Sequence, residues 1–322
     1  MSPVDSDALL AVDRVHRRFI SGGRFARRHP VHALRGISLS VARGETLGIV
    51  GESGCGKSTL ARLMLRLDRP DQGDIRFRQR SIYDLRGSAL AEFRRRVQIV
   101  FQDPQASLNP RHRVGTIIAE PLHIHRQCGG ERCDQRVAQL LTMVGMQPEH
   151  ARRYPHEFSS GQRQRIGIAR ALSLKPDVIV ADEPVSSLDV SIQAQILNLF
   201  KQLQQQLALT YVFISHDLSV VRYLADRVVV MYGGTVVEEA PAAQLFAAPL
   251  HPYSRALLAA VPMPDPGAAA PMPLPVRDAP ADLPCGCVFA SRCPHVRPEC
   301  RAAQPELAVC GPGRRVACRE RL

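Results

Sequence analysis

The chain has 322 residues, 45% of them hydrophobic and 22% charged, and a formal net charge of +12. These values are typical of a globular protein with a substantial core and exclude a wholly disordered chain. No apolar run reaches the roughly 20 residues that a membrane-spanning helix needs, and the start of the chain lacks a secretion signal, so we expect a cytoplasmic protein.

The positive charge raises the question of nucleic-acid binding, because Arg side chains attract phosphates. The basic residues are scattered and have no interleaved aromatic residues, so we predict no specific nucleic-acid binding. Almost all of them are Arg. A Lys at position 57 therefore indicates a role that a guanidinium would not fill.

Short apolar runs rich in β-branched residues alternate with helical patterns, which predicts an α/β core with a largely parallel sheet. The predicted strands are residues 9–15, 36–41, 46–50, 97–101, 178–181, 211–214 and 227–231. The predicted helices are residues 57–67, 114–122, 132–144, 161–172, 191–207 and 218–225.

The pattern also predicts how the chain is divided. Residues from about 103 to 160 show helical patterns and no convincing strand, which predicts a helical subdomain, about 103–172, inserted into an α/β domain over residues 1–260. Residues 261–284 are too rich in Pro for a helix or a central strand and predict an extended linker. Residues 285–322 form a small Cys-rich extension.

A phosphate-binding loop lies between the strand at 46–50 and the helix that starts at 57. Its pattern, G-x-x-x-x-G-K-[ST], is matched by Gly51, Glu52, Ser53, Gly54, Cys55, Gly56, Lys57 and Ser58, with Thr59 following. The glycines let backbone N–H groups turn toward phosphates, and the helix N-terminus favours an anion. We expect Lys57 to reach the β and γ oxygens of ATP and Ser58 to bind Mg²⁺.

Two acids, Asp182 and Glu183, end a buried strand. Asp182 is placed to hold Mg²⁺, and Glu183 is the candidate general base for the attacking water. Gln102 and His216 also follow predicted strands, at the edge where open α/β sheets bind ligands. We expect Gln102 to position water or sense Mg²⁺ and His216 to donate to the γ-phosphate.

With these residues in place, the chain resembles the ATP-binding-cassette ATPases from residue 9 to about residue 246. The deciding segment, Phe158-Ser159-Ser160-Gly161-Gln162, resembles the family's signature motif ahead of a helix, and Ser187-Leu188-Asp189 resembles a second family loop. The resemblance implies an antiparallel β subdomain beside the parallel sheet. It also implies that two cassettes sandwich two nucleotides.

In such a dimer, residues Ser159, Ser160, Gly161, Gln162 and Asp189 would face the ATP bound by the partner. Ser160 departs from the family, which usually has Gly there, and its Cβ could hinder close approach to phosphate or restrict φ. By the same resemblance, Phe19 stands where an aromatic ring stacks on adenine, although an ordinary strand residue is an equal interpretation.

The flanking segments resemble the oligopeptide and dipeptide importers. These segments are residues 101–111, with the sequence FQDPQASLNPR, and residues 251–258, with the sequence HPYSRALL. The sequence from Gly161 to Arg165 resembles the second of the two ATPase subunits in that branch. The resemblance implies a sister ATPase, two permeases and an external solute-binding protein, at the cytoplasmic face of the inner membrane. Nickel, glutathione or another small solute is the alternative cargo, and a soluble cassette acting on nucleic acid is the rival function.

The Cys-rich extension contains Cys287, Cys293, Cys300 and Cys318, whose spacing is too loose for a standard zinc ribbon. Four thiolates suit either zinc or an iron–sulfur cluster. Since some members of the importer branch carry a four-iron four-sulfur cluster at these positions, the resemblance favours that cluster. A set of buried free thiols is the third interpretation. Cys285 and Cys310 are left over.

Overall fold

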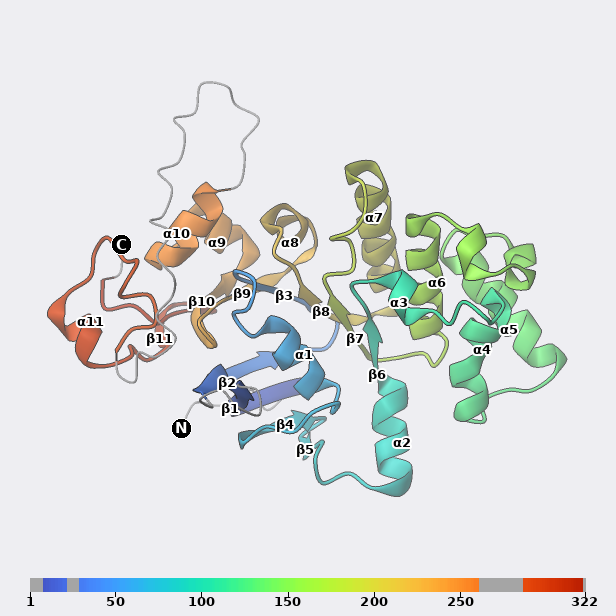
Figure 1. Cartoon of the computed structure of the whole chain (residues 1–322), viewed down its shortest axis with the longest axis horizontal. Helices are drawn as coiled ribbons and strands as arrows, with labels where there is room; N and C mark the ends of the chain where they lie inside the picture. Colours follow the sequence, from blue (N-terminus) through green and yellow to red (C-terminus); the bar gives the residue numbers. More distant parts are fainter. Residues whose placement is uncertain (1–7, 22–28, 261–285, 321–322) are drawn as a thin grey trace.

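The computed structural model describes residues 8–21, 29–260 and 286–320. The predicted linker, residues 261–284, and Cys285 lie outside these ranges. In Figure 1 two sheets occupy the middle of the molecule, a group of helices lies at one end, and the C-terminal residues lie at the other.

The larger sheet carries the site. Its order is β11 (Ala308–Gly311), β12 (Arg314–Val316), β10 (Thr235–Pro241), β9 (Arg227–Tyr232), β3 (Thr46–Val50), β8 (Thr210–Ile214), β7 (Val178–Asp182) and β6 (Val97–Val100). The strands from β9 to β6 pair in parallel, as predicted, and β10, β12 and β11 add antiparallel strands. Every residue of β3 and β8 is buried, as expected for central strands covered on both faces.

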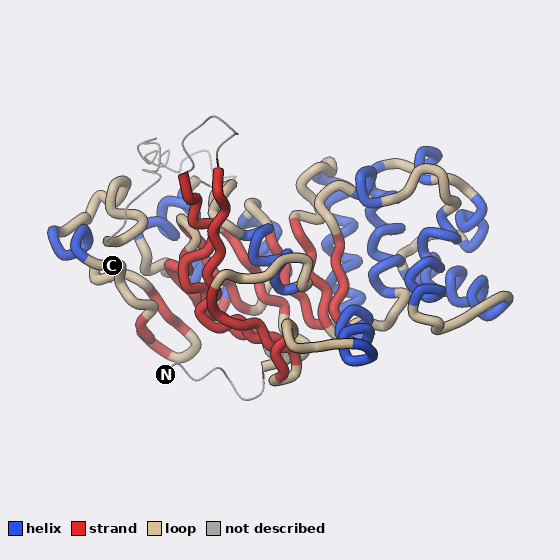
Figure 2. Tube along the Cα trace, turned by 60° about the horizontal axis from the view of Figure 1, so that its bottom comes forward, coloured by secondary structure: helices blue, strands red, loops and turns tan. Residues whose placement is uncertain are grey.

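The smaller sheet is antiparallel, in the order β2 (His29–Val41), β1 (Leu10–Ser21), β4 (Gln72–Phe77) and β5 (Arg80–Ser81). Its apolar face packs with α1 (Lys57–Met64) and with β3 in one core cluster that includes Leu10, Leu34, Leu47 and Leu60. Figure 2 shows this sheet beside the strands of the larger one.

Between β6 and β7 the described chain is helical. It contains α3 (Pro104–Ser107), α4 (Val114–Ile124), α5 (Glu131–Met143), two 3-10 turns (Pro148–Arg152 and Pro155–Glu157) and α6 (Ser160–Leu172). Figures 1 and 2 show these helices gathered at one end of the molecule. Their apolar residues are continuous with those of β7, β8 and α7 (Val190–Leu207), so the helical end shares a core with the sheet.

A disulfide joins Cys128 and Cys133, at the connection between α4 and α5. The turn between the helices brings these two Cα atoms to 5.3 Å, which is within bonding range.

The C-terminal end of the chain returns to the larger sheet. After α8 (Leu218–Leu224), α9 (Ala242–Ala247) and α10 (Pro252–Ala259), the described extension comprises α11 (Pro298–Ala302), β11 and β12. β12 pairs with β10, where Glu238 faces Val316 and Glu239 faces Arg315. The buried Glu238 and Glu239 carboxylates are paired with Arg314 and Arg315 respectively.

The sequence pattern does not predict several of these helices and strands, and β10 and α2 show the physical reasons. β10 includes Glu238 and Glu239, which Arg partners neutralise inside the fold, so no apolar run marks it. In α2 (Gly87–Arg96) the one buried residue is Phe93, so no apolar stripe marks the helix. Within the described residues, no helix is long and apolar enough to cross a lipid bilayer.

Candidate functional site

The phosphate-binding loop connects β3 to α1 at the carboxyl edge of the parallel sheet. Gly51 and Gly56 have φ angles of 153° and 105°. A Cβ on Gly51 would lie 2.2 Å from the Met231 carbonyl oxygen, and one on Gly56 would lie 2.4 Å from the Ala33 carbonyl oxygen. These positions therefore require Gly, and the loop holds a shape that other residues could not adopt.

Lys57 lies at the start of α1 and is 5% exposed. Its Nζ donates hydrogen bonds to the carbonyl oxygens of Gly51 at 2.7 Å and Glu52 at 2.9 Å. These bonds fold the side chain back along the loop, so that the ammonium lies inside the curve of the backbone. Burial raises the pKa of the neighbouring Cys55 thiol, although Lys57 opposes this rise, so Cys55 stays protonated.

Ser58 and Asp182 meet at the centre of the site. The Ser58 hydroxyl donates to Asp182 Oδ1 at 3.2 Å, which links the start of α1 to the end of β7. Burial raises the pKa of the Asp182 carboxyl, against the lowering effect of the Ser58 hydrogen bond. A hydroxyl and a carboxylate are the oxygen ligands that Mg²⁺ prefers, so this pair fits the expected ion.

Glu183 is the centre of a second group of polar side chains. Gln102 Nε2 donates to Glu183 Oε2 at 3.2 Å, and His216 Nδ1 lies 3.0 Å from the same oxygen. Glu183 has a φ of 46°, an unusual angle for a residue with a side chain, and its N–H donates to the Ile214 carbonyl oxygen. The turn after β7 is thereby tied to β8. Two side chains far apart in the sequence, Gln102 and His216, converge on the Glu183 carboxylate.

The signature segment forms the start of α6. The Ser159 hydroxyl accepts from the Gln162 N–H, and the Gln162 side chain accepts from the Ser159 N–H, which together form a capping box. A Cβ on Gly161 would lie 2.4 Å from Ile192 Cγ2, so the absence of a side chain lets α6 pack closely on α7. Ser159 and Ser160 are exposed, and Ser160 is not among the described residues with positive φ. The backbone restriction that we considered for Ser160 therefore does not arise.

Other predicted residues lie apart from the phosphate loop. Asp189 is exposed and precedes α7, where its side chain makes no capping hydrogen bond. Phe19 lies on β1, is 40% exposed, and has the Arg17 guanidinium 4.9 Å from its ring centroid. Within the described structure, no hydrogen bond joins the phosphate loop to Asp189, Phe19 or the signature segment.

Two residues that touch the loop were not anticipated. The Tyr253 hydroxyl accepts from the Glu52 N–H at 2.9 Å, and Arg292 Nη1 donates to Glu52 Oε2 at 2.8 Å. The segments that hold Tyr253 and Arg292 both resemble the importer branch, but the sequence predicted no role for either residue. Both approach from the C-terminal side of the chain.

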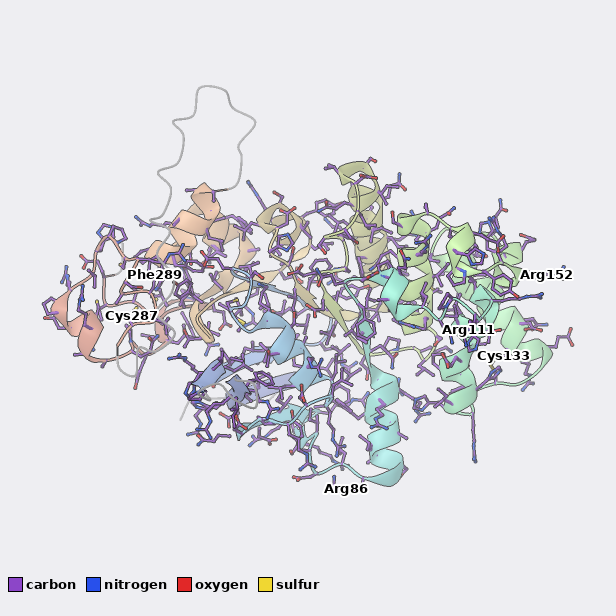
Figure 3. All side chains as sticks on the ribbon, viewed as in Figure 1. Arg86, Arg111, Cys133, Arg152, Cys287 and Phe289 are labelled. Atoms are coloured by element: carbon purple, nitrogen blue, oxygen red, sulfur yellow. A yellow bond between two sulfur atoms is a disulfide. The ribbon has the colours of Figure 1, made fainter. Side chains whose placement is uncertain are left out.

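The described structure gives no support to the iron–sulfur cluster that the resemblance favoured for the cysteine extension. Among residues 8–21, 29–260 and 286–320, no three His, Cys, Asp or Glu side chains are placed so that they could hold a metal ion. Burial raises the pKa of the Cys287, Cys293 and Cys318 thiols, and the nearby Cys300 adds to the rise for each of them. The Cys318 thiol donates to the Glu320 carbonyl oxygen at 2.9 Å. Cys287, Cys293, Cys300, Cys310 and Cys318 form no disulfide in the described structure. Figure 3 shows Cys287 near the fully buried Phe289.

Comparison with known proteins agrees with this geometry. Residues 34–186 match the family model described as "ABC transporter", and residues 237–300 match "Oligopeptide/dipeptide transporter, C-terminal region". The oligopeptide transport ATP-binding protein AppF of Bacillus subtilis is 48% identical, with 99% of each chain covered. The di/tripeptide transport ATP-binding protein DppF of Pseudomonas aeruginosa is also 48% identical, with 96% of each chain covered.

Solved structures with a similar fold belong to the same family. The dimeric structure of MJ0796, a bacterial ABC transporter cassette, matches with a TM-score of 0.64 and 29% identity, over 72% of this chain and 98% of that one. The arrangement of parallel and antiparallel sheets with an all-helical end is the cassette fold. The chain belongs to the ABC transporter family, as one of its ATP-hydrolysing subunits.

Proposed function

We propose that this chain binds and hydrolyses ATP to energise a membrane importer of di- or oligopeptides. The observation that carries the proposal is the convergence of the Ser58–Asp182 pair and the Gln102–Glu183–His216 group beside the phosphate loop. The match of residues 237–300 to the transporter C-terminal region and the names of the relatives support peptides as the cargo.

Each side chain has a role in this proposal. Gly51 to Thr59 cradle the phosphates, with the Lys57 ammonium as the fixed positive charge. Ser58, Asp182 and Gln102 would hold Mg²⁺, which supplies charge neutralisation on the phosphates. Glu183 orients the attacking water and accepts its proton, and His216, hydrogen-bonded to the same carboxylate, is placed to donate to the phosphoryl oxygens.

We further propose that a second cassette completes the site. Ser159, Ser160 and Asp189 are exposed, and the capping bonds of the signature segment are internal. Their exposure leaves the Ser159 and Ser160 hydroxyls and the Asp189 carboxylate accessible to another chain. In this arrangement the partner is a sister ATPase, Phe19 stacks on adenine, and the assembly lies at the cytoplasmic face of the membrane with two permeases and a solute-binding protein.

The division of the chain follows from the same proposal. Residues 1–260 form the nucleotide-binding domain, with the helical subdomain at about 103–172, and residues 285–322 form the extension beyond a linker. Residues 109–111 are exposed beside the start of α4, and we propose that this surface receives the permeases. Deletion of residues 109–114 is then expected to abolish transport while nucleotide binding persists.

A second cargo has specific support. The glutathione import ATP-binding protein GsiA of Pectobacterium atrosepticum is 51% identical over 82% of this chain, although the match covers only 43% of GsiA. Cargo choice in this proposal lies with the permeases and the binding protein. The cassette geometry is the same for either cargo.

Copurification tests the proposal. The full-length chain, affinity-tagged and expressed in its own host, is expected to copurify with two permeases and a second ATPase. When this complex is reconstituted in vesicles, peptide together with the binding protein is expected to stimulate its ATPase activity. Stimulation by glutathione alone would favour the second cargo. Retention of nucleic acid with no membrane subunit would overturn the importer proposal.

A further inference from the structure

The C-terminal part of the chain reaches back to the phosphate-binding loop at one residue, Glu52. Its backbone N–H donates to the Tyr253 hydroxyl at 2.9 Å, and its carboxylate accepts from Arg292 Nη1 at 2.8 Å. Tyr253 lies on α10 and Arg292 lies in the extension, 201 and 240 residues away along the chain. Two separate segments therefore fix the same loop residue, one through its backbone and one through its charge.

The two contacts rest on a block of aromatic rings, Tyr232, Tyr253 and Phe289. Tyr253 and Phe289 are fully buried, and the ring centroids are 4.6 Å apart for Tyr232–Tyr253, 5.2 Å for Tyr232–Phe289 and 5.5 Å for Tyr253–Phe289. Rings at these separations in tilted and edge-to-face arrangements attract each other and resist displacement. Phe289 belongs to the extension, so the extension itself supports the ring that holds the Glu52 N–H.

Arg292 is held in place by its surroundings. Its guanidinium carbon lies 5.7 Å from the Tyr232 ring centroid, its Nη1 also lies 3.4 Å from the Tyr232 hydroxyl, and its side chain is 12% exposed. The Arg292 Nε is buried without a hydrogen-bond partner. Glu52 is the only carboxylate that pairs with Arg292 in the described structure. The hydrogen bond to Glu52 is the main cause that raises the pKa of Arg292.

The pair also solves an electrostatic problem. Glu52 places a carboxylate in the loop that would surround the phosphates of ATP. The carboxylate and the phosphates are both negatively charged, so they would repel each other. A guanidinium bonded to that carboxylate cancels its charge. The Glu52 side chain is 42% exposed, so solvent screens part of the effect, and the consequence for ATP affinity is moderate.

We propose that Arg292 is a positioning residue for ATP binding: it neutralises Glu52 and, with Tyr253, holds the phosphate loop in its binding shape. The extension is then part of the nucleotide site of its own chain. This inference rests on the ATPase activity of the family and is independent of the transported cargo.

Nucleotide titration of the full-length chain tests the inference. The Arg292→Ala variant is expected to raise the Kd for fluorescent Mg-ATP and the KM of hydrolysis about threefold to tenfold, with kcat little changed. The increase is expected to shrink at high ionic strength. Arg297→Ala is the matched control, because it removes the same charge from the same extension, where Arg297 pairs with Glu320 instead of the loop.

The double variant Glu52→Gln/Arg292→Ala separates charge from packing. It is expected to recover most of the affinity lost in Arg292→Ala, because the uncompensated carboxylate is gone. If the double variant stays as weak as Arg292→Ala, or if Arg297→Ala weakens ATP equally, the proposal is overturned. Should Arg292→Ala unfold, as judged by thermal melting, Arg292→Lys and Arg292→Gln provide the same contrast: Lys is expected to bind ATP better than Gln, and equal affinities would refute the charge role.

Discussion

Two helices in this chain begin at sites suited to anions, and they differ in what surrounds them. α1 begins after Gly56 with no side-chain cap, so its first N–H groups are left for a ligand, and Lys57 and Ser58 stand in its first turn. α6 begins at a closed capping box, with Ser159 and Ser160 exposed. The start of α1 includes the Ser58–Asp182 pair, and Gln102 and His216 contact Glu183, the residue after Asp182. The start of α6 presents the Ser159 and Ser160 hydroxyls at the surface.

From this contrast we propose that the chain holds one catalytic centre, at the start of α1, and one accessory surface, at the start of α6. Asp182, Glu183, Gln102 and His216 all gather at the α1 side. Substitutions at the two helix starts should therefore fail in different ways: those near α1 should impair chemistry or nucleotide affinity, and those near α6 should impair packing or assembly.

The largest effect is expected from Glu183→Gln. The amide keeps the size of the side chain but cannot accept the proton of the attacking water, so the rate of phosphate release should fall about 10²- to 10⁴-fold while ATP binding persists. Glu149→Gln, at an exposed position in the helical end, is the control. An unchanged rate in Glu183→Gln would contradict the assignment of the base.

Acidification is expected to lower the free energy of unfolding by about 3 kcal/mol through His251. This residue contacts Tyr253, which in turn contacts the phosphate loop. His251 Nδ1 accepts from the Tyr253 N–H, and burial lowers the pKa of His251 to about 4. Because the unfolded chain binds this proton near pH 6.5 and the folded chain does not, stability present above pH 6.5 should be lost as the pH falls toward 4.

Urea denaturation from pH 7 to pH 4.5 measures this loss. His251→Asn retains an acceptor at the start of α10 but cannot titrate, so its stability should depend less on pH than that of the parent. The exposed His156, replaced in the same way, serves as the comparison. Parallel pH profiles for the parent and His251→Asn would show that His251 is not the responsible group.

Lys57→Ala should weaken Mg-ATP binding about 10- to 100-fold, because the buried ammonium is the fixed cation of the loop. Calorimetric titration gives the affinity. Lys201→Ala, on the distant helix α7, is the matched loss of charge. Equal losses in both variants would mean that general charge, and not the loop, sets the affinity.

A smaller effect, about 1–2 kcal/mol, is expected from Gly161→Ala at the α6 side. The new methyl group would lie 2.4 Å from Ile192 Cγ2, so α6 and α7 must separate. Gly167→Ala is the control within the same helix, since a Cβ there meets nothing within 4 Å and Ala favours a helix. Denaturant midpoints measure both, and equal midpoints would show that the close contact is not required.

Much of the α1 side could be predicted from the sequence because its signals are local. The loop from Gly51 to Ser58 occupies the predicted turn, and the parallel strands that present Asp182 and His216 were read from short buried apolar runs. The exact ends differ by a residue or two. Gln102, for example, lies beyond the end of β6 at Val100.

The C-terminal side could not be predicted in the same way. Arg314 and Arg315 pair with glutamates 76 residues away, and Arg292 reaches a loop 240 residues away, so nothing near them in sequence reports the contact. The spacing of the cysteines suggested a metal site but gave no information on how the extension packs. In the structure the extension packs through Phe289 in a buried cluster and through the pairing of β12 with β10. Long-range pairing of charges inside a sheet leaves no periodic pattern to read.

The most direct test of the account is the ATPase rate of a fixed, dilute amount of this chain as its sister ATPase is added. We predict that phosphate release rises with the added subunit, saturates, and falls back when Ser159 of this chain is replaced by a bulky residue, because α6 serves the partner's nucleotide. A rate that is the same with and without the second subunit, and that ignores Ser159, would contradict the division of the chain into one catalytic centre and one accessory surface.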